Sequence, residues 1–363
     1  MRLVVSTVFI TIAALVPVFA GGQELIQDKT ETAKAKVLEI LSQEERSVPG
    51  TDFTTDYQTI RAEILDGTQK GETVTVKNDF LNLRVGELFY LIHTTNSFDG
   101  TDYYNVSEPY RLVPLLLLFL LFVGVTVYFG GIQGARGLLS LGLSLLFIAL
   151  VLLPGVLKGY SPVLVAVGVS SLIIIMGSYV THGFSRMTTT AVLGMIATVV
   201  LTGVLAQLSI FFTHLSGFGT EESAYLSINL GGKIDMAGLL LGGILIGTLG
   251  VLYDAAIGQS VAVEELSAAG PDLSRHAIYS RALRMGREHV GALVNTLAIA
   301  YVGVSLPLLL LFYGFGSDSV LITINREIFA SEIVRTLVGS IGIILAVPIT
   351  TAVAVRMLVT KRS

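Results

Sequence analysis

The chain of 363 residues contains no cysteine and no tryptophan, and only 14% of its residues are charged. Without cysteine, disulfide frameworks, thiolate metal sites and cysteine nucleophiles are all excluded. Ordinary soluble domains have about a quarter of their residues charged, so this chain falls well below them. The net charge of −4 is too weak, and the basic runs are too short, to indicate nucleic acid binding.

Motifs for common enzyme chemistry are also missing. The sequence has no Walker A motif, no Gly-x-Gly-x-x-Gly and no His-Glu-x-x-His, which argues against ATP as a power source and against a zinc hydrolase. The pair Tyr253-Asp254 superficially resembles an intramembrane aspartyl protease, but that chemistry needs a second membrane aspartate that shares a proton with the first. Asp235 and Asp318 are both expected at the outer side. We therefore expect no enzyme, no cofactor and no metal site.

What the sequence has instead is apolar residues, which make up 52% of the chain. From residue 112 onward they form seven charge-poor segments, each about long enough to cross a hydrocarbon layer of about 30 Å as a helix. The segments are residues 112–130, 137–156, 161–181, 188–213, 236–257, 289–314 and 332–357. We therefore expect a polytopic α-helical membrane protein with a transmembrane domain over residues 112–358, for which the lipid bilayer is the first partner.

The first 21 residues predict a further membrane-directed segment. Arg2 precedes an apolar stretch that ends at Ala20, and the small residues at its end suit cleavage by a signal peptidase. Its length is also close to the lower limit for a membrane-spanning helix. Residues 1–21 are therefore a signal peptide or a first transmembrane helix, and in both cases the residues that follow lie outside the cytoplasm.

Residues 22–111 show the pattern of short strands separated by turns. The expected strands are residues 33–41, 57–65, 72–77 and 85–92, with Gly-containing turns between them. The pattern predicts a small β-rich extracytoplasmic domain, either a barrel or an OB-like sheet. Its histidine, His93, has no ligand or base at a readable spacing, which favours a structural role over a catalytic one.

The distribution of Lys and Arg indicates the orientation in the membrane, because these residues gather in cytoplasmic loops. If the β-rich domain is outside, the loops expected inside contain Arg136, Arg186, Arg275, Arg281, Arg284 and Arg287. The loops expected outside contain chiefly Lys158, Lys233 and Arg326. One helix more or fewer would exchange the two sides, so this bias supports seven helices after the β-rich domain and a cytoplasmic tail at residues 359–363.

A stripe of small residues in the segment 236–257 contains one acid. Its members recur at steps of three and four, so they share one face of a helix: Gly243, Gly247, Gly250, Asp254 and Gly258. Glycines let a neighbouring helix pack closely, and an acid among them should point into the bundle because a charge in lipid costs several kcal/mol. Asp254 is therefore a candidate proton-coupling group. The alternative is a packing role near the cytoplasmic end, or a contact with Arg287.

Two later segments have comparable polar stripes. Their members include Gly291 and Asn295 in one segment, and Glu332, Gly339 and Thr350 in the other. Arg335 follows Glu332 by three residues, so the two side chains can form an ion pair on one helix. We expect the stripe through Asn295 or the stripe through Thr350 to face Asp254. All five polar residues are transport candidates, with packing and interfacial ion pairs as the alternative.

Several longer runs in the membrane half form a recognisable set. They are Gly247–Asp254, Gln259–Leu266, Gly286–Gly291, Asn295–Leu297, Ala300-Tyr301, Ser305–Phe312, Glu332–Gly342 and Ala346–Thr351. In these runs the chain resembles the YibE/F family of bacterial membrane proteins, most specifically between residues 236 and 352. The resemblance implies a bacterial plasma membrane location and marks Gln259, Glu264, Glu265 and Arg287 as cytoplasmic loop residues of interest. It implies no activity.

The chain departs from the family pattern at two positions. The family has an acidic residue where Tyr253 stands and an aspartate where Glu288 stands. The first departure leaves one acid, Asp254, where two carboxylates would otherwise be adjacent.

A weaker resemblance concerns the arrangement of the second half. A glycine-rich helix that ends in Asp254 and is followed by Glu264 and Glu265, together with the external domain, is similar to SecD/SecF-type and RND-type proton-driven exporters. In those proteins acids in membrane helices carry the coupling proton. The resemblance therefore implies that role for Asp254, as a fold-level analogy.

These patterns together predict an ion-gradient-coupled transporter or exporter of an unassigned solute. The alternative is an assembly module, whose external domain binds a partner while the helices anchor it, although seven helices with internal polar stripes exceed what an anchor needs. An intramembrane hydrolase has little support. Further partners could be a second copy of the chain or another membrane subunit, and no nucleic acid is expected.

Overall fold

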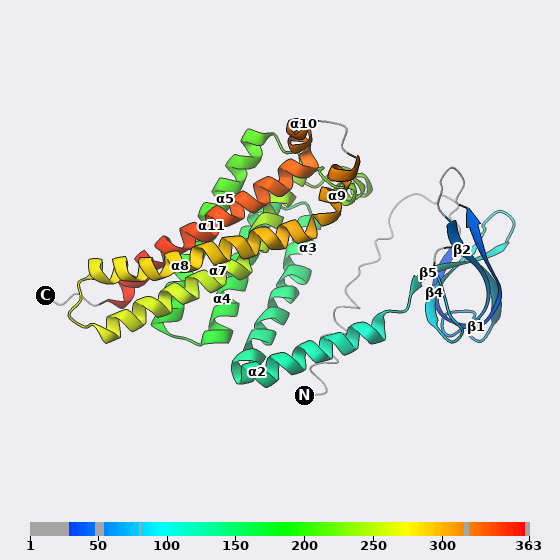
Figure 1. Cartoon of the computed structure of the whole chain (residues 1–363), viewed down its shortest axis with the longest axis horizontal. Coiled ribbons are helices and arrows are strands. Elements are labelled where there is room, and N and C mark those ends of the chain that lie inside the picture. Colours follow the sequence, from blue (N-terminus) through cyan, green and yellow to red (C-terminus); the bar gives the residue numbers. More distant parts are fainter. Residues whose placement is uncertain (1–28, 48–53, 80, 316–318, 360–363) are drawn as a thin grey trace. The chain divides into compact units, whose positions relative to one another are not determined.

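The computed structural model describes residues 29–47, 54–79, 81–315 and 319–359 (Figure 1). The chain divides into two compact units, Met1–Val125 and Thr126–Ser363. The first contains a strand-rich domain and the second contains most of the helices. The expected signal or anchor segment, residues 1–21, lies outside the described residues, as do residues 360–363 of the expected tail.

In the described part of the first unit, five strands form a closed barrel, which confirms the predicted β-rich domain. The strands are β1 (Lys29–Ser47), β2 (Thr54–Ile64), β3 (Thr73–Asn78), β4 (Leu88–Thr95) and β5 (Asp102–Pro109). Their order around the barrel is β1-β2-β3-β5-β4, and β1 closes it by pairing with both β2 and β4. Strand β5 was not predicted from the sequence, because none of its residues is fully buried and its apolar alternation is weak.

The barrel has its own core, built from alternate residues of its strands. Ala35, Ile60 and Phe89 are fully buried there. The buried amide of Gln58 is also satisfied: its oxygen accepts from the backbone N–H of Leu83 at 2.9 Å, and its nitrogen donates to the carbonyl of Leu83 at 3.0 Å. These two hydrogen bonds attach the segment between β3 and β4 to β2.

Helices make up the rest of the described chain. They are α2 (Leu112–Phe147), the π-helical turn η1 (Ile148–Leu152), α3 (Leu153–Leu157), α4 (Pro162–His182), α5 (Arg186–Thr213), α6 (Glu221–Asn229), α7 (Met236–Ala269), α8 (Arg275–Val304), α9 (Leu306–Phe315), α10 (Val320–Asn325) and α11 (Glu327–Leu358). Within the described residues, five continuous helical runs are long and apolar enough to cross a membrane, or six if α8 and α9 count as one span bent by 62°. The predicted multi-pass helical domain is thereby confirmed at this level.

The helices differ from the predicted segments where proline or glycine interrupts the backbone. The segment 289–314, predicted as one membrane helix, is broken, because α8 ends at Val304 and Pro307, near the start of α9, has no N–H to continue the hydrogen-bond ladder. The turn η1 precedes Pro154 for the same reason. The first two predicted segments form one run with a non-helical residue, Gly131 (φ 55°), inside α2. Helix α7 continues past residue 257 to Ala269.

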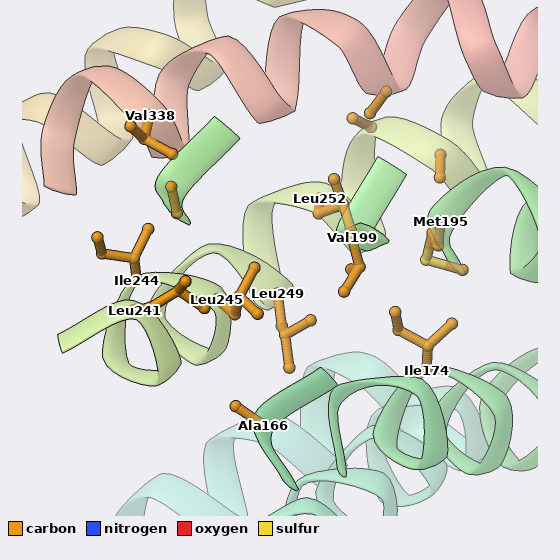
Figure 2. Packing of buried hydrophobic residues seen from close by; sticks show 14 of the residues in the cluster. Ala166, Ile174, Met195, Val199, Leu241, Ile244, Leu245, Leu249, Leu252 and Val338 are labelled. Atoms are coloured by element: carbon orange, nitrogen blue, oxygen red, sulfur yellow. The ribbon is translucent and has the colours of Figure 1, made fainter. Parts of the chain in front are cut away.

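The main apolar core of the second unit lies among α4, α5, α7 and α11. Figure 2 shows side chains from these helices converging on it, including Ile174 from α4, Met195 from α5 and Leu245 from α7. Burial of such side chains against other helices, rather than against lipid, fixes which faces meet.

Glycines allow α11 to approach its neighbours closely. A Cβ atom at Gly194 of α5 would lie 2.9 Å from the Cα of Thr350, and one at Gly339 would lie 2.7 Å from Cγ2 of Thr248 in α7. Both distances are shorter than real Cβ contacts allow, so a side chain would push the helices apart. Gly342 and Gly286 make similarly close contacts with Thr202 and Val347, so helix α11 depends on several glycine positions for its central place in the bundle.

Hydrogen bonds hold both ends of α11. At its start, the carboxylate of Glu327 accepts from the backbone N–H groups of residues 216–218 at 2.6–3.1 Å and from the hydroxyl of Ser216 at 2.7 Å. At its end, the carbonyl of Val359 accepts from the guanidinium of Arg275 at 2.6 and 3.0 Å. These bonds place the loop after α5 and the start of α8 relative to α11.

Candidate functional site along helix α7

The glycine-bearing face of α7 is open along most of its length. Apart from adjacent residues and the backbone of α7 itself, no described atom lies within 4 Å of a Cβ built at Gly243, Gly250 or Gly258, so the close packing predicted at these three glycines does not occur among the described residues. Gly247 differs, because the hydroxyl of Tyr301 in α8 would lie 2.6 Å from its Cβ. The neighbouring helices therefore leave space along this face, and two cavities open onto it.

The first cavity has a volume of about 260 Å³ and lies among α7, α8 and α11. It is lined by Asp254, Ala255, Gly258, Gln259, Ala262, Met285, His289, Leu293 and Val347. Asp254 and His289 are the two ionisable groups of this lining, and both side chains are exposed. Gln259 is buried and its carbonyl accepts from the hydroxyl of Thr351 at 2.8 Å. A carboxyl group and an imidazole, each able to exchange a proton, thus share a mostly apolar space.

The second cavity has a volume of about 470 Å³ and lies nearer the Met236 end of α7. It is lined by Leu152, Val156, Pro162, Leu239, Gly242, Gly243, Ile246, Gly247, Tyr301 and Arg335. The guanidinium of Arg335 forms an ion pair with Glu332 at 3.1 Å, as their spacing predicted. The other carboxylate oxygen of Glu332 accepts from the hydroxyl of Ser305 at 3.5 Å. The polar part of this cavity is therefore a neutralised ion pair beside a phenol.

Two polar atoms at the second cavity have no hydrogen-bond partner among the described residues. They are the hydroxyl of Tyr301 and the Nε of Arg335, and both atoms are buried. Tyr301 also lies close enough to Arg335 and Glu332 to interact with them electrostatically. An unpartnered buried donor costs about 1–3 kcal/mol, so these two atoms need an explanation.

The structure brings some predicted residues together and leaves others apart. Asp254, Gly258 and Gln259 share the first cavity, and Gly243, Gly247 and Arg335 share the second. The remaining exposed candidates line neither cavity: Gly250, Glu264, Glu265, Arg287, Gly291 and Asn295.

The face of α8 that meets α7 is not the predicted one. The expected stripe through Gly291 and Asn295 is exposed, whereas Met285, His289 and Leu293 line the cavity of Asp254. A shift of two residues turns a helix by about 200°, which moves the stripe to the opposite face. His289, Leu293 and Tyr301 are separated by four and then eight residues, so they share one face of α8. That spacing is the signal that would have identified the face of α8 that meets α7.

Thr350 does not face Asp254 either. It is fully buried against Gly194 of α5, and its hydroxyl has no hydrogen-bond partner among the described residues. Tyr253, which stands beside Asp254, donates its hydroxyl to the carbonyl of Gly177 in α4 at 3.3 Å. Both side chains serve helix contacts in this structure.

In the barrel, His93 has a partner that the sequence did not reveal. Its Nε2 lies 2.7 Å from the carboxylate of Asp102, and its ring stacks on Tyr104 with centroids 4.9 Å apart. The partner is hidden in the sequence because it comes from β5, on the neighbouring strand. Hydrogen bonds from the Thr95 hydroxyl and from His93 lower the pKa of Asp102. No cluster of metal-binding side chains occurs among the described residues.

Comparison with known proteins gives one finding. A family model described as YibE/F-like protein matches residues 118–360, a range that contains both cavities. No curated protein and no solved structure matches the chain.

Proposed function

The chain belongs to the YibE/F-like protein family, and from this premise we propose that it is a multi-pass transporter of the bacterial plasma membrane, coupled to a proton gradient through Asp254. One observation carries the proposal. Asp254 and His289 share an open, mostly apolar cavity on the face of α7 that the neighbouring helices leave uncovered. Ionisable groups within membrane helices are costly and mark pathways more often than they serve packing.

The chemistry of coupling follows from the surroundings of Asp254. A protonated carboxyl group is neutral and can be enclosed by apolar side chains, whereas the ionised form favours an arrangement open to water. One proton would therefore bias two arrangements of α7 and α8. Ala255, Gly258 and Ala262 have small side chains at this cavity, which leaves room for α8 to move toward α7.

We further propose that the helical domain crosses the membrane seven times. The run Leu112–Leu157 has 46 residues, which is about 69 Å of helix and more than twice the hydrocarbon thickness. The non-helical backbone at Gly131 (φ 55°, ψ −141°) divides it into two spans. We count these two, the bent pair α8–α9 and the four other membrane-length helices as seven spans. With the barrel outside, this proposed count puts the arginine-rich loops in the cytoplasm, as the distribution of Lys and Arg favours.

The barrel supports a second candidate function, that of an extracytoplasmic interaction module. We propose that it is OB-like, because it has the strand order β1-β2-β3-β5-β4 with a parallel β3–β5 pair. Barrels of that kind bind extended ligands on their strands and loops. The cavities along α7 are more than a membrane anchor needs, so the transporter proposal ranks first.

The test of the transporter proposal compares Asp254→Asn with Asp254→Glu in a deletion strain profiled for exported solutes and proteins. Asparagine keeps the size of the side chain but cannot titrate, whereas glutamate keeps the acid. We expect the Asn variant to be made and inserted at normal levels and to fail to restore the wild-type profile. The Glu variant should restore part of it.

The matched control is Glu264→Gln, an exposed carboxylate on the same helix that lines neither cavity. This variant should restore the profile fully. Full restoration by Asp254→Asn would contradict the proposal and leave Asp254 with a packing role.

A further inference from the structure

We infer that the cavity at Tyr301 and Arg335 binds an amphipathic molecule: an apolar chain that bears a neutral hydrogen-bond acceptor, such as an ester carbonyl or a hydroxyl. If the protein is the proposed transporter, this molecule is its substrate class, and only that part of the inference rests on the proposed function. Binding itself depends on the cavity alone and can be measured without transport.

The acceptor is required by the two unpartnered donors. The hydroxyl of Tyr301 and the Nε of Arg335 are buried and have no acceptor among the described residues, and both residues belong to the lining of this cavity. The phenol is placed there by Gly247, because any side chain at that position would clash with its hydroxyl. An oxygen of a bound molecule would satisfy both donors.

The acceptor is neutral because the charge of Arg335 is already balanced. Its guanidinium is paired with Glu332 at 3.1 Å, and no other cation among the described residues lines the cavity. A carboxylate or phosphate entering here would meet the carboxylate of Glu332 in surroundings of low polarity, where repulsion between like charges is strong. A carbonyl or hydroxyl oxygen has no such conflict.

The rest of the cavity fits an apolar chain. Leu152, Val156, Leu239 and Ile246 form its wall, and Gly242 and Gly243 widen it on the side of α7. The volume of about 470 Å³ falls within the range of about 300–1,000 Å³ found for small-molecule sites. A mostly apolar wall with a few converging polar groups is also the usual composition of such sites.

The experiment uses the full chain in vesicles of phosphatidylethanolamine and phosphatidylglycerol. The probe is a diazirine analogue of methyl oleate, which combines an ester carbonyl with a single apolar chain, and mass spectrometry maps the labelled residues. We expect labelling on α3 and on the first half of α7. Unlabelled methyl oleate should compete, and both oleate and octadecane should compete less well.

Two variants and two matched controls test the site. Gly243→Leu should fill the cavity, since no described atom outside its own stretch of α7 lies within 4 Å of its Cβ, and should reduce labelling at least about tenfold. Tyr301→Phe should weaken binding about fivefold through the loss of one hydrogen bond. Gly250→Leu adds the same side chain outside the cavity, and Tyr253→Phe removes a hydroxyl that donates elsewhere, so both should leave labelling unchanged.

The outcomes separate the alternatives. Stronger competition by oleate, equal competition by octadecane, or labelling that Gly243→Leu leaves unchanged would each overturn the inference. If phospholipid added to the protein in detergent competes with the probe, the occupant comes from the bilayer; if it does not, the occupant is a single-chain solute, and both results support the site. Asp254→Asn should bind the probe normally, so loss of binding and loss of coupling can be told apart.

Discussion

At the residue scale, the barrel shows how surface carboxylates are held ionised. The hydroxyl and backbone N–H of Thr68 donate to Glu31 and lower its pKa, and Thr95 and His93 do the same for Asp102. A carboxyl group whose pKa is lower in the folded state adds stability above its unfolded pKa. That contribution is lost as the pH falls through the folded pKa.

We therefore expect the barrel, produced alone as residues 22–111, to keep its stability from neutral pH down to the ordinary pKa of Glu31, 4.5, and to lose it progressively below that value. Asp102→Asn should lose less stability over the same acidic range, because the residue no longer titrates. Thermal unfolding followed by circular dichroism between pH 7 and pH 3 measures both. An identical pH dependence in the variant and the wild type would show that the Asp102 hydrogen bonds do not contribute.

At the scale of elements, close contacts at glycine distinguish packed faces from open ones. A Cβ at Gly194 of α5 would meet the backbone of Thr350, whereas one at Gly243 of α7 would meet no described atom of another helix within 4 Å. The same substitution at the two positions should therefore have different effects, although both glycines lie inside helices of similar apolar character.

Gly194→Ala should destabilise the helical domain by about 1–3 kcal/mol, because the new methyl group would force α5 and α11 apart. Gly243→Ala should be neutral or slightly stabilising, since alanine favours the helix more than glycine. The purified protein in detergent can be compared by thermal melting at 222 nm. Equal melting temperatures for the two variants would contradict the packing of α5 on α11 described here.

The membrane helices could be predicted from the sequence, because a chain segment surrounded by lipid must form a helix. Backbone groups in a membrane must bond within their own segment, so the apolar runs gave the helices without tertiary information. The face that each helix presents was harder to predict, because α8 is apolar on several sides and the stripe through Asn295 was as regular as the one through His289 and Tyr301. The bend near Pro307 depends on local backbone geometry that hydropathy does not report, whereas the break at Gly131 lies at the predicted boundary after residue 130.

Part of the candidate site could also be predicted from the sequence. Asp254 could be identified because a single acid among glycines is unusual in a membrane segment. His289, which shares a cavity with Asp254, and Tyr301, which shares one with Arg335, both come from α8. These residues lie on different helices from Asp254 and Arg335, and no local spacing encodes how such helices pack. The barrel shows the same limit, since Asp102 reaches His93 only through the pairing of β4 with β5.

At the scale of the whole molecule, the number of spans decides on which side each loop lies. With the barrel outside and seven spans, the Ala269 end of α7 and the start of α8 are cytoplasmic, together with their arginines. If the run Leu112–Leu157 crossed only once, every later loop would exchange sides, and the end of α7 would be outside. A single position at the end of α7 therefore discriminates between the two topologies.

The chain has no native cysteine, so single cysteines report without background. Lys70→Cys, in an exposed turn of the barrel, should react with an impermeant thiol reagent on intact cells. Ala268→Cys, exposed near the end of α7, should react only after the cells are opened, because seven spans place it in the cytoplasm. Labelling of Ala268→Cys on intact cells, with Lys70→Cys also labelled, would mean an even number of crossings before that point in place of the five we propose.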